Sequence, residues 1–309
     1  FGVVFSVLFF SSKRIVRQEA ESHAGSELSG TVYQIEDILH QVEAAAKNME
    51  WLVRDRLGNP DSLYAVTRMM MRTNPHVIGS CVAFEPGFYA EKGELFAPYS
   101  YLTEEGEVKD RNLGYAAYNY HAKEWYATPK RLDRNYWSEP YFDEGGGDRV
   151  MSTYSHVLRN GEGKMFGILT ADISLDHLSG LVNGIKPYPG SYTLMISRLG
   201  NYLVHPKPER ILHETIYTAT SDMTDRSVTI LGDAMIRGEE GMHELQNDDT
   251  LSYVFYKPVE GTEWSVAVVC PYRDVFAPLD RLTLVVVEPP STPRIYSRPA
   301  MTLLFCEGR

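Results

Sequence analysis

The sequence has few of the features that assign a chain to a well-known class of protein. Its 309 residues include only three cysteines, Cys81, Cys270 and Cys306, which are too few and too scattered for a disulfide framework or a metal cage. We interpret each as a small apolar residue, so cysteine usage leaves the redox compartment open. No run rich in lysine or arginine is present and the formal net charge is −11, so we expect no nucleic-acid partner.

Signatures of catalysis and cofactor binding are also missing. The sequence contains neither a nucleophile elbow nor the zinc-binding pattern H-E-x-x-H. Three consecutive glycines at 145–147 are not followed by the Lys-Ser/Thr pair of a phosphate-binding loop, and we interpret them as a mobile lid. We therefore expect no cofactor, no metal and no enzymatic activity in this part of the chain.

Neither end carries an apolar run of the roughly twenty residues that a membrane helix needs. Residues 1–10 are almost entirely apolar, so we expect residues 1–12 to be the end of a membrane or signal segment. Lys13 and Arg14 argue against this expectation, because they follow the apolar run and the positive charges of such segments usually precede it. After the apolar run at 282–287, prolines follow and no helical or strand period returns. We expect residues 288–309 to form a disordered tail.

One long helix is predicted near the N-terminus. Between residues 13 and 57 there is no proline, and over its second half apolar residues recur at steps of three and four. At 1.5 Å per residue this helix is about 60 Å long, which suits a link to a membrane, pairing with a second copy, or packing along the flank of a domain. A shorter helix, capped by Asp61 and running to Met71, would complete a helical stalk over 13–74.

After residue 75 the pattern changes to short strands separated by glycine and proline. The first set predicts an antiparallel sheet with a helical segment at 115–126 and a helix at 176–185 capped by Ser174. The strands of this sheet are predicted at 77–84, 95–102, 150–158 and 164–173.

A second set of strands repeats this order more weakly, with a helix at 223–237. Its strands are predicted at 191–197, 202–205, 241–246, 251–258 and 264–271. The sequence therefore predicts an α+β protein made of two tandem modules, 75–187 and 188–271, followed by a C-terminal helix over 272–287.

The segment from 118 to 178 gathers aromatic and charged residues around the first predicted sheet. Aromatic rings exclude water from a pocket, and charges then select a polar ligand. Lys123 could meet a carboxylate and Asp172 an ammonium group, while Trp125 and Tyr141 enclose the remainder. The alternatives that involve no ligand are that Asp172 pairs with Lys123, and that Trp125, Trp137 and Tyr141 are core aromatics.

Four sequence stretches resemble the double-Cache extracellular sensor domains of bacterial transmembrane receptors. They are W-Y at 125–126, W-S-E-P-Y-F-D at 137–143, G-I-L-T-A-D-I-S-L at 167–175 and I-S-R-L-G-N-Y-L-V-H-P at 196–206. The resemblance covers about residues 13–284. It implies a long N-terminal helix, a membrane-distal and a membrane-proximal PAS-like module, and a C-terminal helix that enters the membrane.

The resemblance also implies a set of ligand-binding positions in the distal module. They are Tyr118, Lys123, Trp125, Tyr126, Tyr141, Asp143 and Asp172, to which the residue pattern adds Trp137 and Thr153. Asp143 is equally suited to shaping its loop, and Thr153 to lying on the sheet face. Lys123 stands where the family has an arginine that grips the ligand carboxylate, and a lysine is a point charge rather than a two-bond fork.

The leading hypothesis is thus a sensor of an amino acid or a related amine or carboxylate, placed outside the cell membrane or in the periplasm. The full protein would be membrane-anchored, would form a homodimer through the N-terminal helix, and would signal to a cytoplasmic output domain such as a kinase or phosphatase. One alternative is a hydrolase of small substrates or glycans that uses Glu139, Asp143 and Asp172. Another is a protein-interaction domain with its aromatic cluster exposed.

Overall fold

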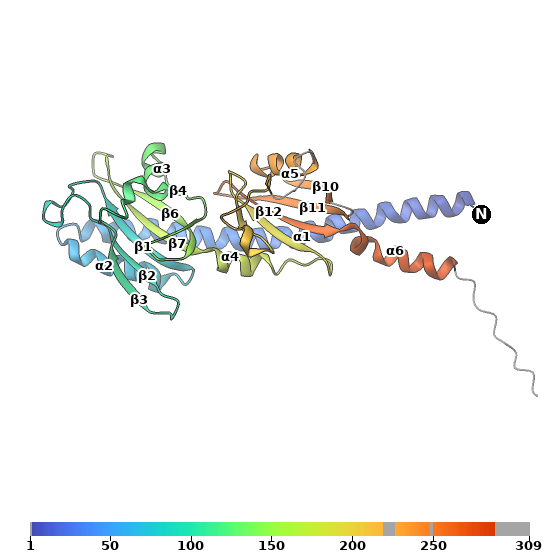
Figure 1. The fold of residues 1–309 in the computed structure, drawn as a ribbon, viewed down its shortest axis with the longest axis horizontal. Coiled ribbons are helices and arrows are strands. Elements are labelled where there is room, and N and C mark those ends of the chain that lie inside the picture. The colour runs from blue at the N-terminus through green and yellow to red at the C-terminus, as the bar shows by residue number, and fades with distance from the viewer. Residues whose placement is uncertain (1, 219–225, 248–249, 288–309) are drawn as a thin grey trace, which may run out of the picture.

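The computed structural model describes residues 2–218, 226–247 and 250–287. Two antiparallel sheets lie one after the other along a single helix, α1 (Gly2–Asp55), as Figure 1 shows. The start of α1 and the last helix, α6 (Tyr272–Val287), lie at the same end of the molecule. The predicted two-module α+β architecture is confirmed. The predicted tail at 288–309 lies outside the described residues.

Helix α1 holds both modules through one apolar stripe. Its buried side chains recur at steps of three and four and are at most 3% exposed: Ala20, Ala24, Leu28, Val32, Ile35, Leu39, Val42 and Ala46. The helix begins earlier than predicted, at Gly2, because nothing in residues 2–12 interrupts it. On the proximal side, the backbone N–H of Glu260 donates to Glu36 Oε1 over 2.8 Å.

The distal sheet has the strand order β3-β2-β1-β7-β6-β4, and β5 also pairs with β6. Helix α2 (Leu63–Thr73) packs against β1 and β2, and α4 (Leu175–Val182) follows β7. The strands are β1 (Val77–Phe84), β2 (Pro98–Leu102), β3 (Val108–Asn112), β4 (Tyr136–Trp137), β5 (Tyr141–Phe142), β6 (Val150–Arg159) and β7 (Met165–Ser174).

The distal module departs from the sequence prediction at several places, including the short strands β4 and β5, which were not predicted. Strand β3 was missed because its residues, V-K-D-R-N, are largely exposed and lack apolar alternation. The helical segment predicted at 115–126 begins and ends later, as a short 3-10 turn (Tyr120–Ala122) followed by α3 (Glu124–Leu132). Asp61 does not cap α2, because it lies inside a 3-10 turn (Pro60–Ser62) that precedes the helix. Ser174, by contrast, caps α4 as predicted, accepting from the N–H of Asp176.

The proximal sheet has the strand order β10-β11-β12-β8-β9, with α5 (Arg226–Ile236) packed on it. Its strands are β8 (Tyr192–Ile196), β9 (Tyr202–Val204), β10 (Gly241–Asn247), β11 (Thr250–Val259) and β12 (Trp264–Pro271). All five predicted strands are present within about one residue at each end. The first residues of the helix predicted at 223–237 lie outside the described residues.

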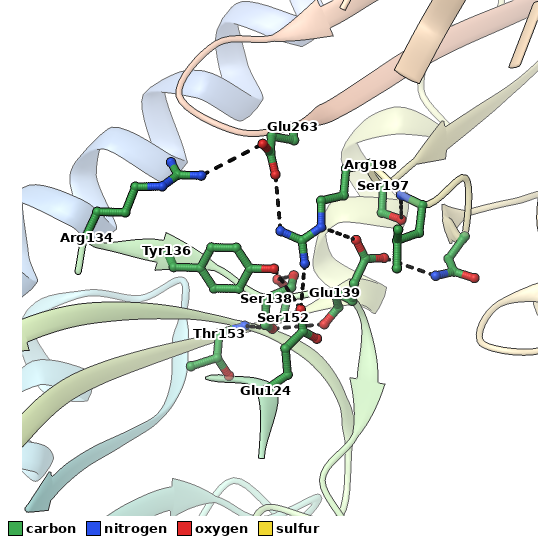
Figure 2. A network of polar contacts seen from close by, with 12 residues as sticks. Glu124, Arg134, Tyr136, Ser138, Glu139, Ser152, Thr153, Ser197, Arg198 and Glu263 are labelled. Atoms are coloured by element: carbon green, nitrogen blue, oxygen red, sulfur yellow. Dashed lines mark hydrogen bonds and ion pairs between the residues drawn. The ribbon is translucent and has the colours of Figure 1, made fainter. Parts of the chain in front are cut away.

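The two modules meet at an ionic network centred on Arg198, which Figure 2 shows. The Arg198 guanidinium contacts Glu124 (2.7 Å) and Glu139 (3.3 Å) of the distal module, and Glu263 (3.2 Å) of its own module. It also covers the ring of Tyr136, 4.7 Å from the centroid. Burial raises the pKa of both Glu124 and Glu139; the charge of Arg198 opposes this shift at Glu124, and hydrogen bonds from Ser197 and Asn201 oppose it at Glu139.

We expect Arg198→Gln to lower the free energy of unfolding by about 1–3 kcal/mol at pH 7, because partly buried carboxylates lose their partner. The loss should shrink at pH 5, since Glu124 and Glu139 then take up protons in the folded state. Urea unfolding at both pH values measures this. Arg237→Gln, which removes an exposed ion pair with Glu239, is the control and should change little. An equal loss at both pH values would contradict the ionic explanation.

Candidate functional site

The face of the distal sheet that points away from α1 carries a buried polar cluster. Side chains alternate between the two faces of each strand. Leu169, Ala171 and Ile173 of β7 therefore belong to the α1-facing core, while Asp172 lies on the opposite face. Thr153 is the register partner of Asp172 on β6, so the two side chains meet on that face.

Hydrogen bonds join the cluster into two short chains. Thr153 Oγ1 donates to Asp172 Oδ1 over 2.9 Å, and the Tyr141 hydroxyl lies 2.7 Å from Thr153 Oγ1. The Tyr118 hydroxyl donates to Asp143 Oδ1 over 2.5 Å. All five residues were predicted to bind ligand, and the structure brings them together. The backbone N–H of Gly147 also donates to Asp143 Oδ2 over 2.7 Å, so Asp143 shapes its loop as well.

Two glycines allow the backbone to come close to the cluster. A Cβ at Gly79 would lie 2.5 Å from both Asp172 Oδ2 and the Tyr99 hydroxyl, and one at Gly147 would lie 2.8 Å from the Tyr99 hydroxyl. Tyr99 is only 1% exposed, yet its hydroxyl has no hydrogen-bond partner of good geometry among the described residues. A larger side chain at Gly79 would thus push into the place where Asp172 and Tyr99 face each other.

The electrostatics of the cluster favour a positively charged guest. Burial and the neighbouring Asp143 raise the pKa of Asp172 to about 7. Burial also raises the pKa of Asp143, against the effects of Tyr118, Gly147 and Lys123. Within the described part of the chain no ion pair reaches either carboxylate, and Lys123 Nζ lies over the Tyr118 ring, 4.7 Å from its centroid. The alternative in which Asp172 pairs with Lys123 is not what the structure shows.

Trp125 and Tyr126 lie beside the cluster in the first turn of α3. Trp125 is 3% exposed and stacks on Tyr120, with ring centroids 6.1 Å apart. Its carbonyl accepts from Ser155 Oγ of β6, which fixes α3 against the sheet. The Tyr126 hydroxyl donates to Glu85 Oε1 over 2.8 Å, and so points away from the two aspartates.

Trp137 and Glu139 are not in this cluster. Trp137 pairs in register with Tyr154 of β6 and therefore lies on the α1-facing side of the sheet. There its indole N–H donates to Glu43 Oε1 of α1, and its ring packs on Trp264 of the proximal module. Glu139 belongs to the network of Arg198 (Figure 2). The shared W-S-E-P-Y-F-D stretch thus serves both the module junction and the cluster.

Sequence reasoning missed Tyr99 and Arg111. Tyr99 was hidden in an apolar strand, although the alternation P-Y-S-Y-L places it and Tyr101 on one face, where their rings stack 5.5 Å apart. Arg111 of the unpredicted β3 donates to the carbonyls of Gly145 and Gly146. The glycine loop interpreted as a lid is therefore tied to the sheet by an arginine.

The fold defines the class of protein. The periplasmic sensory domain of the Campylobacter jejuni chemoreceptor Tlp1 is similar over 85% of this chain and 99% of that one, with a TM-score of 0.67 and 13% identity. The ligand-binding domain of the Pseudomonas aeruginosa amino acid chemoreceptor PctB, solved with L-Gln, is similar over 87% and 100%, with a TM-score of 0.59 and 17% identity. The described chain has this two-module sensor fold, and the resemblance to double-Cache domains is confirmed.

The sequence comparison finds similarity to one family over the distal module. Residues 63–180 match the model of the methyl-accepting chemotaxis protein-like first PDC sensor domain. The chain is also 27% identical to the methyl-accepting chemotaxis protein PscA of Pseudomonas syringae pv. tomato over 168 residues, which are 53% of this chain and 24% of that protein. The distal module is therefore similar in sequence to the sensor domains of chemotaxis receptors. The chain spans about a quarter of the length of the curated relatives it matches.

Within the described residues, no helix combines the length and apolarity of a membrane span.

We expect Asp172→Asn to stabilise the ligand-free protein at pH 8, by roughly 2–4 kcal/mol at most. A carboxylate whose folded-state pKa is raised to about 7 costs stability as the pH rises above its unfolded value, and asparagine removes that cost. The advantage should fade towards pH 5, where Asp172 is protonated in the folded state. Urea unfolding at pH 5 and pH 8 measures the difference, with exposed Asp37→Asn as the control. A less stable variant at pH 8 would contradict the assignment.

Proposed function

We propose that the distal module binds a small molecule that carries an ammonium group, and that Asp172 and Asp143 hold this group. The observation that carries the proposal is the burial of two neighbouring carboxylates without a cation on either, within the described chain. Buried charges in proteins are almost always paired, so a site of this kind is complete only with a cationic partner. The Tyr99 hydroxyl beside Asp172 has no hydrogen-bond partner of good geometry among the described residues, so it is a further group for a ligand to satisfy.

An amino acid fits this site best, and a simple amine is the second class. Lys123, half-buried at the start of α3, would meet the ligand carboxylate, while Trp125, Tyr118 and Tyr141 enclose the rest. Thr153 holds Asp172 in position. Two proteins of similar fold were solved with L-Gln and L-isoleucine, which supports the same ligand class here. We assign Tyr126 a positioning role, and we do not include Trp137 among the ligand contacts.

A signal could pass from the distal cluster to the proximal module through Glu124, the residue after Lys123 in the sequence. Glu124 is the first residue of α3 and contacts Arg198 of the proximal module. A ligand that draws in Lys123 would move this contact and so change how the modules sit on α1. We propose that the domain lies outside the membrane and signals through α1 and α6, whose outer ends lie together (Figure 1). A homodimer through α1 and an anchored full-length protein complete this proposal.

The hydrolase alternative is less well supported. A carboxylate pair for glycoside hydrolysis must flank one substrate bond. Glu139 is held by Arg198 and Asn201 at the module junction, whereas Asp143 and Asp172 share the distal cluster with tyrosines and a threonine. The aromatic residues of the distal cluster are also buried rather than exposed, which argues against an adhesive surface.

The proposal is tested by thermal unfolding and calorimetry of the purified chain with amino acids, amines and organic acids. A ligand that binds only the folded state raises the unfolding midpoint. We expect an amino acid or amine to bind, and Asp172→Asn to weaken binding about a hundredfold, since a charged contact is lost. Binding should also weaken as the pH falls below 7, where Asp172 is protonated. Failure of every amine-bearing compound, or unchanged binding to Asp172→Asn, would refute the proposal.

A second substitution separates the two ligand classes. We expect Lys123→Met to weaken the binding of amino acids about tenfold or more, while amines without a carboxylate keep their affinity. Lys130→Met, which removes a lysine of the same helix that pairs with Glu85, is the matched control and should affect neither class. Equal losses for both ligand classes would show that Lys123 acts through the structure rather than on a carboxylate. Calorimetric titration with each ligand gives the comparison.

A further inference from the structure

The proximal module contains a small cavity of its own, between its sheet and helix α5. Six of the side chains that form its walls are apolar and at most 8% exposed: Leu194, Ile216, Val228, Leu231, Leu245 and Val269. The free volume is about 60 Å³. An ordered water needs roughly 10–15 Å³ of such space, so the cavity holds a guest of about four to six non-hydrogen atoms. This size excludes most amino acids.

One end of the cavity is polar and carries Arg210. The Arg210 side chain is 23% exposed, and its Nε lies 3.3 Å from Glu214 Oε2. Arg210 lines the cavity together with Tyr192 and Tyr202, and its charge opposes the burial that raises the pKa of both hydroxyls. The arginine therefore reaches the cavity wall instead of extending into solvent.

His205 adds a second donor to the same end. The backbone N–H of Lys207 donates to His205 Nδ1 over 2.9 Å, which places the ring proton on Nε2. The ring packs on Tyr202, with centroids 4.6 Å apart. Burial and Arg210 lower the pKa of His205, so the neutral ring is the form present at pH 7. Arg210, His205 and the tyrosines thus offer mainly donors.

We propose that this cavity is a second ligand site, which binds a short-chain monocarboxylate of the size of acetate or propionate. The carboxylate contacts Arg210 and the His205 Nε2–H, and the alkyl group lies among Val228 and Leu231 of α5. An arginine at a small, mostly apolar cavity suits a carboxylate because a guanidinium bonds both of its oxygens. A cation is disfavoured, because Glu214, the carboxylate beside Arg210, is already paired with it.

The test is calorimetric titration of the full chain with sodium acetate and sodium propionate, with sodium chloride and ethylammonium chloride as controls. We expect saturable binding of one carboxylate per chain and none of ethylammonium. Arg210→Gln should weaken binding about tenfold or more, because a charged hydrogen bond is lost. Leu231→Phe, which fills the cavity and leaves Arg210 in place, should abolish it. Arg237→Gln removes an exposed arginine of the same module and should leave binding intact.

Asp172→Asn distinguishes this site from the distal pocket. Acetate binding that persists in Asp172→Asn and disappears in Arg210→Gln supports the proximal site whether or not the distal pocket takes an amine. If Leu231→Phe fails to fold, Arg210→Gln with Asp172→Asn still decides between the two sites. The proposal is overturned if neither carboxylate binds saturably, if Arg210→Gln binds as tightly as the unchanged chain, or if Asp172→Asn loses the acetate response.

Discussion

The packing of both sheets against one stripe of α1 is the constraint on which the rest of the structure depends. Each sheet buries one face against this helix, so the other face of each is left to form its own cluster or cavity. The distal aspartates and the proximal cavity both lie on those second faces. Because a strand alternates its side chains, the residues that hold the module to α1 and those that build a site come from the same strands.

Stability and function compete at the distal cluster. A buried carboxylate beside another is unfavourable without a cation, and close contacts at Gly79 and Gly147 leave the cluster little freedom to relax. Residues nearby compensate: Thr153 and Tyr118 donate hydrogen bonds to the aspartates, and Arg111 ties down the glycine loop. Sites of recognition commonly retain such unfavourable groups, because the ligand then supplies the missing partner.

The sequence was sufficient for much of the fold, because apolar spacing and turn residues mark most helices and strands; β1 and β12 match their predicted bounds. Its failures were local. Strand β3 has exposed residues on the edge of the sheet, where pairing and not burial defines the strand. Residue type and resemblance were sufficient to predict the five residues that form the distal cluster. They did not predict the face of the sheet on which each residue lies: Trp137 lies on the α1 side because it pairs in register with Tyr154. Tyr99 and the proximal cavity required three-dimensional packing to be seen.

Lys123 and Glu124 are consecutive in the chain, yet one faces the distal cluster and the other reaches Arg198. Coupling between two sites is reciprocal, so a ligand that shifts the Glu124–Arg198 contact has its own affinity shifted by the same factor when that contact changes. On the proposed function, a shift of the modules would therefore alter how tightly the distal cluster holds its ligand. On the same proposal, the adjacency of these two residues would let a change at the module junction adjust ligand affinity without altering a residue of the distal cluster.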